Sequence, residues 1–141
     1  MRAYLSAVPV RPTLLLIAIL LTGIRPSVLH GQVRNPPPSV TPVGGALQAP
    51  ANTTGLSASF TVYNNDTTDK VINWACSRSG GVTSCSSSSS HLIGGGGSWP
   101  VTVTYATGAP GSGTLTLTAT APDGGSGQGY YNVTEIGRAH V

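Results

Sequence analysis

The chain has 141 residues, which is enough for one domain at most. Its formal net charge of +3 comes from the two ends, because three basic and three acidic residues balance each other between residues 32 and 134. Those six are Arg34, Lys70 and Arg78 against Asp66, Asp69 and Asp123. A neutral domain lacks the basic surface that binds a phosphate backbone, so the sequence predicts no nucleic-acid partner.

Residues 1–31 are predicted to be a signal peptide that forms an N-terminal helix. Arg2 and Arg11 come before an apolar core at residues 13–24. This core is too short to span a bilayer comfortably, but its length is typical of a signal peptide. Gly31 offers a cleavage point ahead of Gln32. We therefore expect a secreted or cell-surface protein that meets the membrane only through this leader. An uncleaved membrane anchor is the alternative.

The first strands are expected directly after the leader. Residues 32–38 hold three successive prolines and predict a short, stiff spacer. Ser39–Pro42 predicts an edge strand, where a proline is tolerated, and residues 43–49 its continuation after a glycine break. Leu56–Tyr63 predicts a further strand, which the turn formers at 64–66 end.

The middle of the chain combines one strand with a long loop. Lys70–Cys76 predicts a strand with Ile72, Trp74 and Cys76 on one face. Residues 77–97 contain a serine run and four successive glycines, and they are predicted to form a loose, solvated loop.

The clearest strands are expected near the C-terminus, at residues 98–106 and 113–121, with a last one at 130–134. Apolar and polar residues alternate there at a period of two, most plainly in Thr114–Thr120, so one face of each strand points into a core. The predicted inward residues of the three best-defined strands are Ala58, Phe60, Val62, Trp99, Val101, Val103, Tyr105, Leu115, Leu117 and Ala119.

This spacing of six or seven short strands predicts an all-β fold, an immunoglobulin-like two-sheet β-sandwich of about seven strands over residues 39–134. An oligonucleotide-binding barrel is the structural alternative. Such a barrel normally shows a helix and basic or aromatic strand faces, and the sequence after the leader has neither.

The whole stretch from Ser39 to Thr134 resembles the immunoglobulin-like modules of large bacterial surface and secreted proteins, above all those ahead of rearrangement-hotspot (YD-repeat) regions. The segments that carry the resemblance are Val40-Thr41-Pro42 with Gly44-Gly45, Ser59–Asn64, Cys76 with Val82–Cys85, Val101–Tyr105, Gly111–Ala119 and Tyr131–Thr134. The resemblance implies spacing, display or adhesion, and it brings no catalytic residues. It also implies a longer chain, because no YD repeat is present here.

Residues 135–141 are similar to the translation of a sequencing adapter, GAG ATC GGA AGA GCA CAC GTC, whose next codon is the stop TGA. We therefore expect Glu135–Val141 to be a non-native tail and the natural chain to continue beyond Thr134. On this interpretation Glu135, Arg138 and His140 carry no function. A genuine charged tail is the alternative.

Cys76 and Cys85 are the two cysteines, and in an exported chain an even number predicts a disulfide. The bridge would stabilise a small domain by roughly 2–3 kcal/mol on the chain-entropy model. A metal site that adds His91 is the alternative, but two sulfurs and one imidazole fall short of a tetrahedral set. We predict no metal and no cofactor.

The sequence predicts no catalytic residue. Ser86–Ser90 followed by His91 suggests a nucleophile, but a hydrolase also needs an orienting acid and an oxyanion pocket, and no Gly-x-Ser-x-Gly elbow is present. The glycines at 94–97 are not a phosphate cradle, because no Lys-Ser/Thr follows them. The chain is therefore not expected to be an enzyme.

Individual residues suggest two further kinds of binding site, one for calcium and one for a sugar. The oxygens of Asn64, Asn65, Asp66 and Asp69 suit calcium, but without a bidentate glutamate a hydrogen-bonded turn is favoured. Aromatic residues could stack on a sugar. Trp74, Trp99 and Tyr105 share faces with core residues, however, which leaves Tyr63 and Tyr130 outward and too sparse for a platform.

These observations predict a non-catalytic structural or display module at the N-terminus of a longer exported bacterial protein. Its expected partners are the neighbouring domains of its own chain. The alternative is an adhesin-type domain that binds a cell-surface glycan or protein through residues 77–97.

Overall fold

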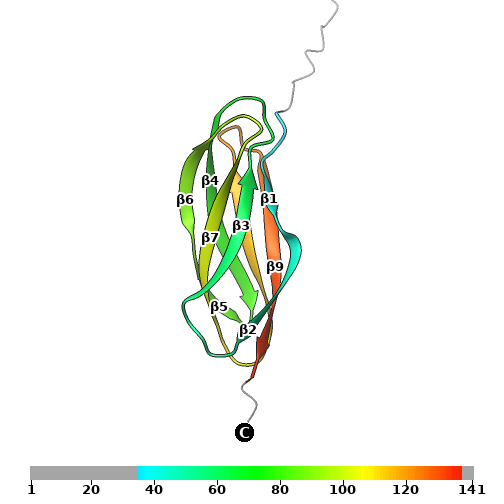
Figure 1. Ribbon diagram of the computed structural model, residues 1–141, viewed down its shortest axis with the longest axis vertical. Helices are drawn as coiled ribbons and strands as arrows, with labels where there is room; N and C mark the ends of the chain where they lie inside the picture. Colours follow the sequence, from blue (N-terminus) through cyan, green and yellow to red (C-terminus); the bar gives the residue numbers. More distant parts are fainter. Residues whose placement is uncertain (1–34, 138–141) are drawn as a thin grey trace, which may run out of the picture. The chain divides into compact units, whose positions relative to one another are not determined.

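Nine strands in two stacked sheets make up residues 35–137, the part of the chain that this computed structural model describes (Figure 1). They are β1 (Ser39–Thr41), β2 (Val43–Pro50), β3 (Leu56–Tyr63), β4 (Lys70–Gly80), β5 (Val82–Ser86), β6 (Ser88–Ile93), β7 (Ser98–Thr107), β8 (Gly111–Thr120) and β9 (Ser126–Ile136). The all-β, immunoglobulin-like two-sheet sandwich is confirmed. The expected signal helix at residues 1–31 lies outside the described residues. No helix long and apolar enough to cross a membrane occurs in the described part.

The four-stranded sheet has the order β1-β3-β7-β5, and the five-stranded sheet has the order β2-β9-β8-β4-β6. Neighbouring strands are antiparallel except β2, which runs parallel to β9. The core lies between the sheets because every second side chain of the central strands points inward. Val62, Val103, Leu115, Leu117 and Ala119 are fully buried there.

The chain passes from one sheet to the other on both sides of the sandwich. On one side β1 pairs with β3, and after the cis peptide bond Thr41–Pro42 the chain continues as β2 in the other sheet. On the other side β5 pairs with β7, and one residue later the chain continues as β6 beside β4. Each crossover lets a single stretch of chain close both layers on its side.

The expected loop at residues 77–97 is wrong over most of its length. β4 extends to Gly80, and β5 and β6 occupy residues 82–86 and 88–93. Serine carries no hydrophobic periodicity, yet its backbone pairs as well as that of any other residue, and a strand at a sheet edge needs few apolar side chains. In β6 only His91 and Ile93 turn toward the interior.

The last strand is longer than expected, because β9 begins at Ser126 and continues through Ile136. The glycines at 127 and 129 had suggested a turn. In the structure they lie in the strand where β1 and its leading segment cross closely, and a Cβ added to Gly129 would meet the Val40 side chain at 2.8 Å. Glycine here serves close packing between two stretches of backbone.

Candidate functional site: the crossover disulfide and the two ends of the sandwich

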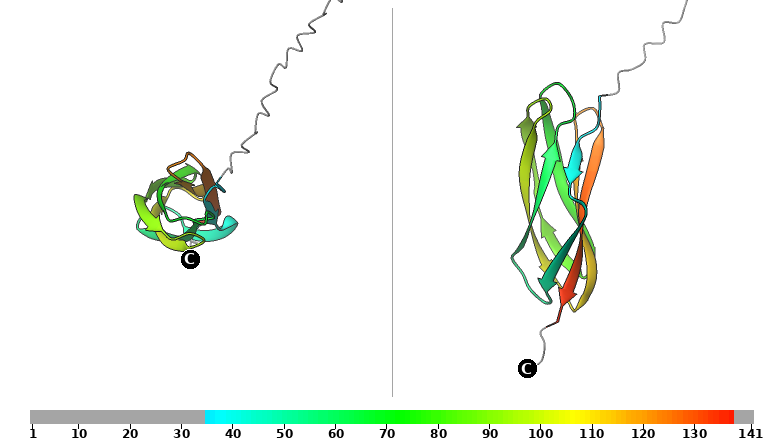
Figure 2. Two further views of the ribbon diagram at one scale, coloured as in Figure 1. Left: turned by 90° about the horizontal axis from the view of Figure 1, so that it is seen from above. Right: turned by 45° about the vertical axis from the view of Figure 1, so that its right-hand side comes forward.

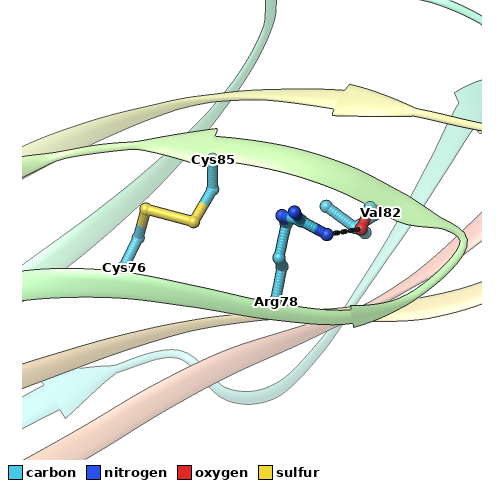
Figure 3. Close-up of a disulfide and its surroundings, with 4 residues drawn as sticks. All are labelled: Cys76, Arg78, Val82 and Cys85. Atoms are coloured by element: carbon cyan, nitrogen blue, oxygen red, sulfur yellow. Dashed lines mark hydrogen bonds between the residues drawn. A yellow bond between two sulfur atoms is a disulfide. The ribbon is translucent and has the colours of Figure 1, made fainter.

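Cys76 and Cys85 are joined by a disulfide between β4 and β5, which belong to different sheets (Figure 3). Their Cα atoms lie 6.2 Å apart. Next to this bond the Cys76 N–H donates to the Ser87 carbonyl at 3.0 Å, at the residue where the chain changes sheet. The bridge therefore links two strands across the layers at the crossover, not a strand to a loop.

Arg78 supports the same region from β4. Its guanidinium Nη1 donates to the carbonyl of Val82 across the tight β4–β5 turn at 3.3 Å (Figure 3). Val82 is fully buried, so the turn is fixed on its inner side by packing and on its outer side by this hydrogen bond. Along the chain, the disulfide at Cys85 therefore lies between the anchored turn at Val82 and the change of sheet at Ser87.

The N-terminal end of the sandwich is formed by the loops 64–69, 94–97 and 121–125. The buried Asn64 ties the first two together: its side-chain amide donates to the carbonyls of Thr68 at 2.8 Å and Ile93 at 2.9 Å. Its backbone N–H donates to the Gly97 carbonyl at 2.9 Å. The glycine run at 94–97 is thus the β6–β7 turn, held by an asparagine from the β3–β4 loop.

An ion cluster connects the third loop. Lys70 Nζ lies 2.7 Å from Asp66 Oδ2 and also pairs with Asp123 in the β8–β9 loop. The Lys70 ammonium, followed by the Thr68 N–H, lowers the pKa of Asp66 from 3.8 to about 2. The same ammonium lowers the pKa of Asp123, and the two carboxylates, Asp123 first, raise the pKa of Lys70. Asp66 is therefore held ionised by a lysine.

The remaining residues of the considered calcium site also serve the fold. Asp69 accepts the Gly95 N–H at 3.1 Å, and the side-chain amide of Asn65 donates to the Pro37 carbonyl at 2.8 Å. No group of three or more His, Cys, Asp or Glu side chains is placed to hold a metal within residues 35–137. The Asn65 hydrogen bond fixes the spacer on the domain, so the incoming chain is held where it meets the first strand.

The serine run and His91 do not form a nucleophile and base. Ser88–Ser90 lie on β6, and the His91 ring stacks on Trp99 with ring centroids 3.5 Å apart. Trp99 was expected in the core, but it lies at the end of β7 and is 39% exposed. Strand parity points its ring inward. At that position the His91 ring covers one face of the indole and the rest remains partly exposed.

The other aromatic residues serve packing. Trp74 and Tyr105 are buried, and burial followed by the nearby Glu135 charge raises the pKa of Tyr105. Tyr131 packs edge-on against Phe60 with centroids 5.0 Å apart, and its hydroxyl donates to the Ser59 carbonyl at 2.8 Å. This arrangement leaves Tyr63 and Trp99 partly exposed on different faces, which does not make a sugar platform.

Glu135 is the one acidic residue that the structure places in an unexpected environment. It is 4% exposed, and neither carboxylate oxygen has a hydrogen-bond partner in the described part of the chain. Its carboxyl group lies against Gly81, where an added Cβ would be 2.5 Å from it. The next residue, Ile136, points outward and is 49% exposed, because parity from Tyr131 and Val133 turns residue 135 inward.

No family model and no curated protein matches this sequence. Solved structures with a similar fold include native α2-macroglobulin from Escherichia coli, at 15% identity and a TM-score of 0.49, covering 72% of this chain and 17% of that one. The secreted serine protease VesC from Vibrio cholerae is similar at 15% identity and a TM-score of 0.48, covering 67% and 22%. The seventh PapD-like domain of human CEP192 is similar at 14% identity and a TM-score of 0.46, covering 74% and 89%.

At these identities and TM-scores the likeness carries no argument beyond the two-sheet β-sandwich described above. A β-sandwich hosts many unrelated activities, so no activity passes from these proteins to this chain. The features that the described residues present are structural. A disulfide joins the two sheets, and hydrogen bonds and ion pairs hold the loops at the N-terminal end together.

Proposed function

We propose that this chain is the beginning of a longer exported bacterial surface protein and that residues 35–137 serve as its first, non-catalytic structural or display module. The observation that carries the proposal is where the first and last strands of the sandwich begin and end. The start of β1 and the end of β9 lie at opposite ends of the sandwich (Figure 2). A module with its termini at opposite ends can be strung head to tail with further modules.

The contacts at both ends support this arrangement. At the N-terminal end, Asn65 holds the Pro37 carbonyl, and Gly125 lies where an added Cβ would be 3.3 Å from Pro37. At the other end, β9 leaves the sandwich beside Pro110, which an added Cβ on Gly137 would meet at 3.2 Å. A spacer held on the domain at one end and a strand that runs outward at the other suit a stiff array of domains. The partners of this module would then be the neighbouring domains of the same chain.

The buried, unpaired carboxylate of Glu135 supports the further proposal that residues 135–141 are not native. A buried polar group without a hydrogen-bond partner is costly inside a fold. Natural inward positions of a closing strand are normally apolar, as Val133 is here.

Resequencing the gene past the codon for Thr134, followed by expression of the natural gene in a bacterial host, tests the proposal. We expect an open frame beyond that codon, further domains downstream, and an exported product that begins near Gln32. A chain that ends at Val141 in its natural gene would overturn the display proposal. A product intact from Met1 and bound to the membrane would replace the signal peptide by an anchor. Binding to a glycan array that is lost on substitution within residues 77–97 would favour the adhesin alternative.

A further inference from the structure

β6 is an edge strand that leaves one side of its backbone unpaired. Its residues pair regularly with β4, from Ala75 opposite Ser88 to Lys70 opposite Ile93. On the side of β6 away from β4, the Ile93 carbonyl accepts a hydrogen bond from the Asn64 side chain. Within residues 35–137, no other hydrogen bond reaches the β6 backbone on that side. Such a row of free N–H and C=O groups is a template for another strand.

β6 also lacks the features that normally protect an edge. Over its six residues it contains no proline, glycine, charged side chain or β-bulge. The residues that face outward with it on β4 are also uncharged: Val71, Asn73 and Ala75. Val71 and Leu92 are direct partners on this face and are 45% and 59% exposed, so they form a small apolar patch beside the free edge.

The other three edge strands, β1, β2 and β5, are obstructed. β1 has three residues and is followed by Pro42, β2 contains a bulge between Val43 and Gly45 and ends at Pro50, and β5 contains a bulge and is held by Arg78. The stretch of β7 that β5 does not cover contains Pro100. In the stretch of β3 that β1 does not cover, the Ser59 carbonyl already accepts a hydrogen bond from the Tyr131 hydroxyl. Within residues 35–137, β6 is therefore the edge that is open to an added strand.

We infer that two copies of this chain pair through β6, antiparallel and about a two-fold axis, so that two five-stranded sheets become one continuous sheet. A second copy offers the same open edge and no other, which makes the contact isologous and closes the assembly at two. Because β6 carries no charged side chain, the β6 edges of two copies do not repel each other. Pairing with Ser90 opposite Ser90 places five of the six β6 residues opposite one another, with Ser88 opposite Leu92 and Ser89 opposite His91 of the second copy.

A cysteine placed at the axis tests this register. Directly opposed residues of antiparallel strands have Cα atoms about 4.5–5.5 Å apart, which is within disulfide reach. Ser90→Cys should therefore yield a covalent dimer under mild oxidation. Asn73→Cys is the matched control, because it lies opposite Ser90 on the same exposed face but one strand farther from the axis. Two such residues would be roughly 14 Å apart at a strand spacing near 4.8 Å, too far to bridge.

Sedimentation of the full chain measures the association without cross-linking. We expect a reversible dimer of the 14.2 kDa chain that Leu92→Lys weakens by roughly tenfold or more, since a lysine on an edge strand opposes pairing. Val43→Lys, at a residue that is 66% exposed on the bulged edge, should leave the dimer intact. Ser90→Pro, checked for folding by circular dichroism, should abolish it.

A monomer at all concentrations up to the millimolar range would overturn the inference. So would a dimer that Leu92→Lys and Ser90→Pro both leave unchanged, or cross-linking through Asn73→Cys as efficient as through Ser90→Cys. None of these outcomes bears on the display function proposed above.

Discussion

At the scale of single residues, Glu135 shows how strand parity decides the environment of a side chain. It follows Tyr131 and Val133 at a spacing of two and therefore enters the interior, where its carboxylate has no hydrogen-bond partner among the described residues. We predict that Glu135→Val raises the free energy of unfolding by about 1–3 kcal/mol, because an unsatisfied buried polar group costs about that much. Urea denaturation of both proteins measures the difference.

The matched control is Ile136→Thr, one residue further along the same strand, which should change the free energy of unfolding little because Ile136 is 49% exposed. A Glu135→Val protein less stable than the original would mean that the carboxylate contributes favourably to the fold, contrary to this prediction.

The ion cluster at the N-terminal end predicts a dependence of stability on acid. Because Lys70 holds the pKa of Asp66 at about 2 in the folded chain against its usual 3.8, ionised Asp66 stabilises the fold above about pH 4. This contribution is lost as the pH falls from 4 toward 2, and Asp123, whose pKa is also lowered, adds to the same loss. Urea midpoints between pH 6 and 2 should fall more steeply for the original protein than for Asp66→Asn.

Asp69→Asn is the control in the same loop, since it leaves the ion pair between Lys70 and Asp66 in place and should keep the steep fall. Equal slopes in the original protein and Asp66→Asn would show that the ion pair does not contribute to the acid dependence.

The alternation of residues was enough to predict most of the core but not the polar contacts. Phe60, Val101 and Leu117 are buried, as the period of two required. The link between Lys70 and Asp123 spans 53 positions and depends on two loops meeting at one end of the sandwich, which no local pattern encodes. Trp99 was misplaced for a related reason: parity gave its direction, but its place at the end of the strand left it at the rim.

At the scale of elements, β5 and β6 show the limit of hydrophobic periodicity. Their sequence, rich in serine, reads as a loop, and their pairing becomes visible only when β4 and β7 supply the partner backbones. The cysteines were the available signal, because a bridge between residues nine positions apart suits two strands that turn back on each other. The strand at Leu56–Tyr63, by contrast, was predicted with its observed limits.

The disulfide at this crossover predicts both a mass and a stability. Mass spectrometry of the exported protein should show a gain of two hydrogens on reduction. Replacing both cysteines by serine should lower the free energy of unfolding by about 2–3 kcal/mol, the value for a loop of this size on the chain-entropy model. Two alkylatable thiols in native, air-oxidised protein would contradict the prediction and reopen the metal alternative.

At the scale of the whole molecule, the end of β9 is where the proposed native chain and the observed one diverge. Beyond Thr134 the backbone still pairs on both sides: Glu135 lies opposite Ala49 in β2 and Gly111 in β8, and the Ile136 carbonyl accepts the Ala51 N–H at 3.0 Å. These contacts belong to the main chain and would form with other residues. The Glu135 side chain, by contrast, adds two buried carboxylate oxygens without a hydrogen-bond partner among the described residues.

Thermal unfolding of three versions of the protein separates these two contributions. Cutting the chain after Thr134 removes both the last pairings of β9 and the buried carboxylate, so the two effects oppose each other and the midpoint should move by no more than roughly 3 °C. Extending the chain from Thr134 with its natural downstream residues keeps the pairing and removes the carboxylate. A gain of about 1 kcal/mol corresponds to a rise of roughly 4–8 °C in a domain of this size. If the cut lowers the midpoint by many degrees while natural extension adds nothing, residues 135–141 belong to the native strand and the proposal of a non-native tail is wrong.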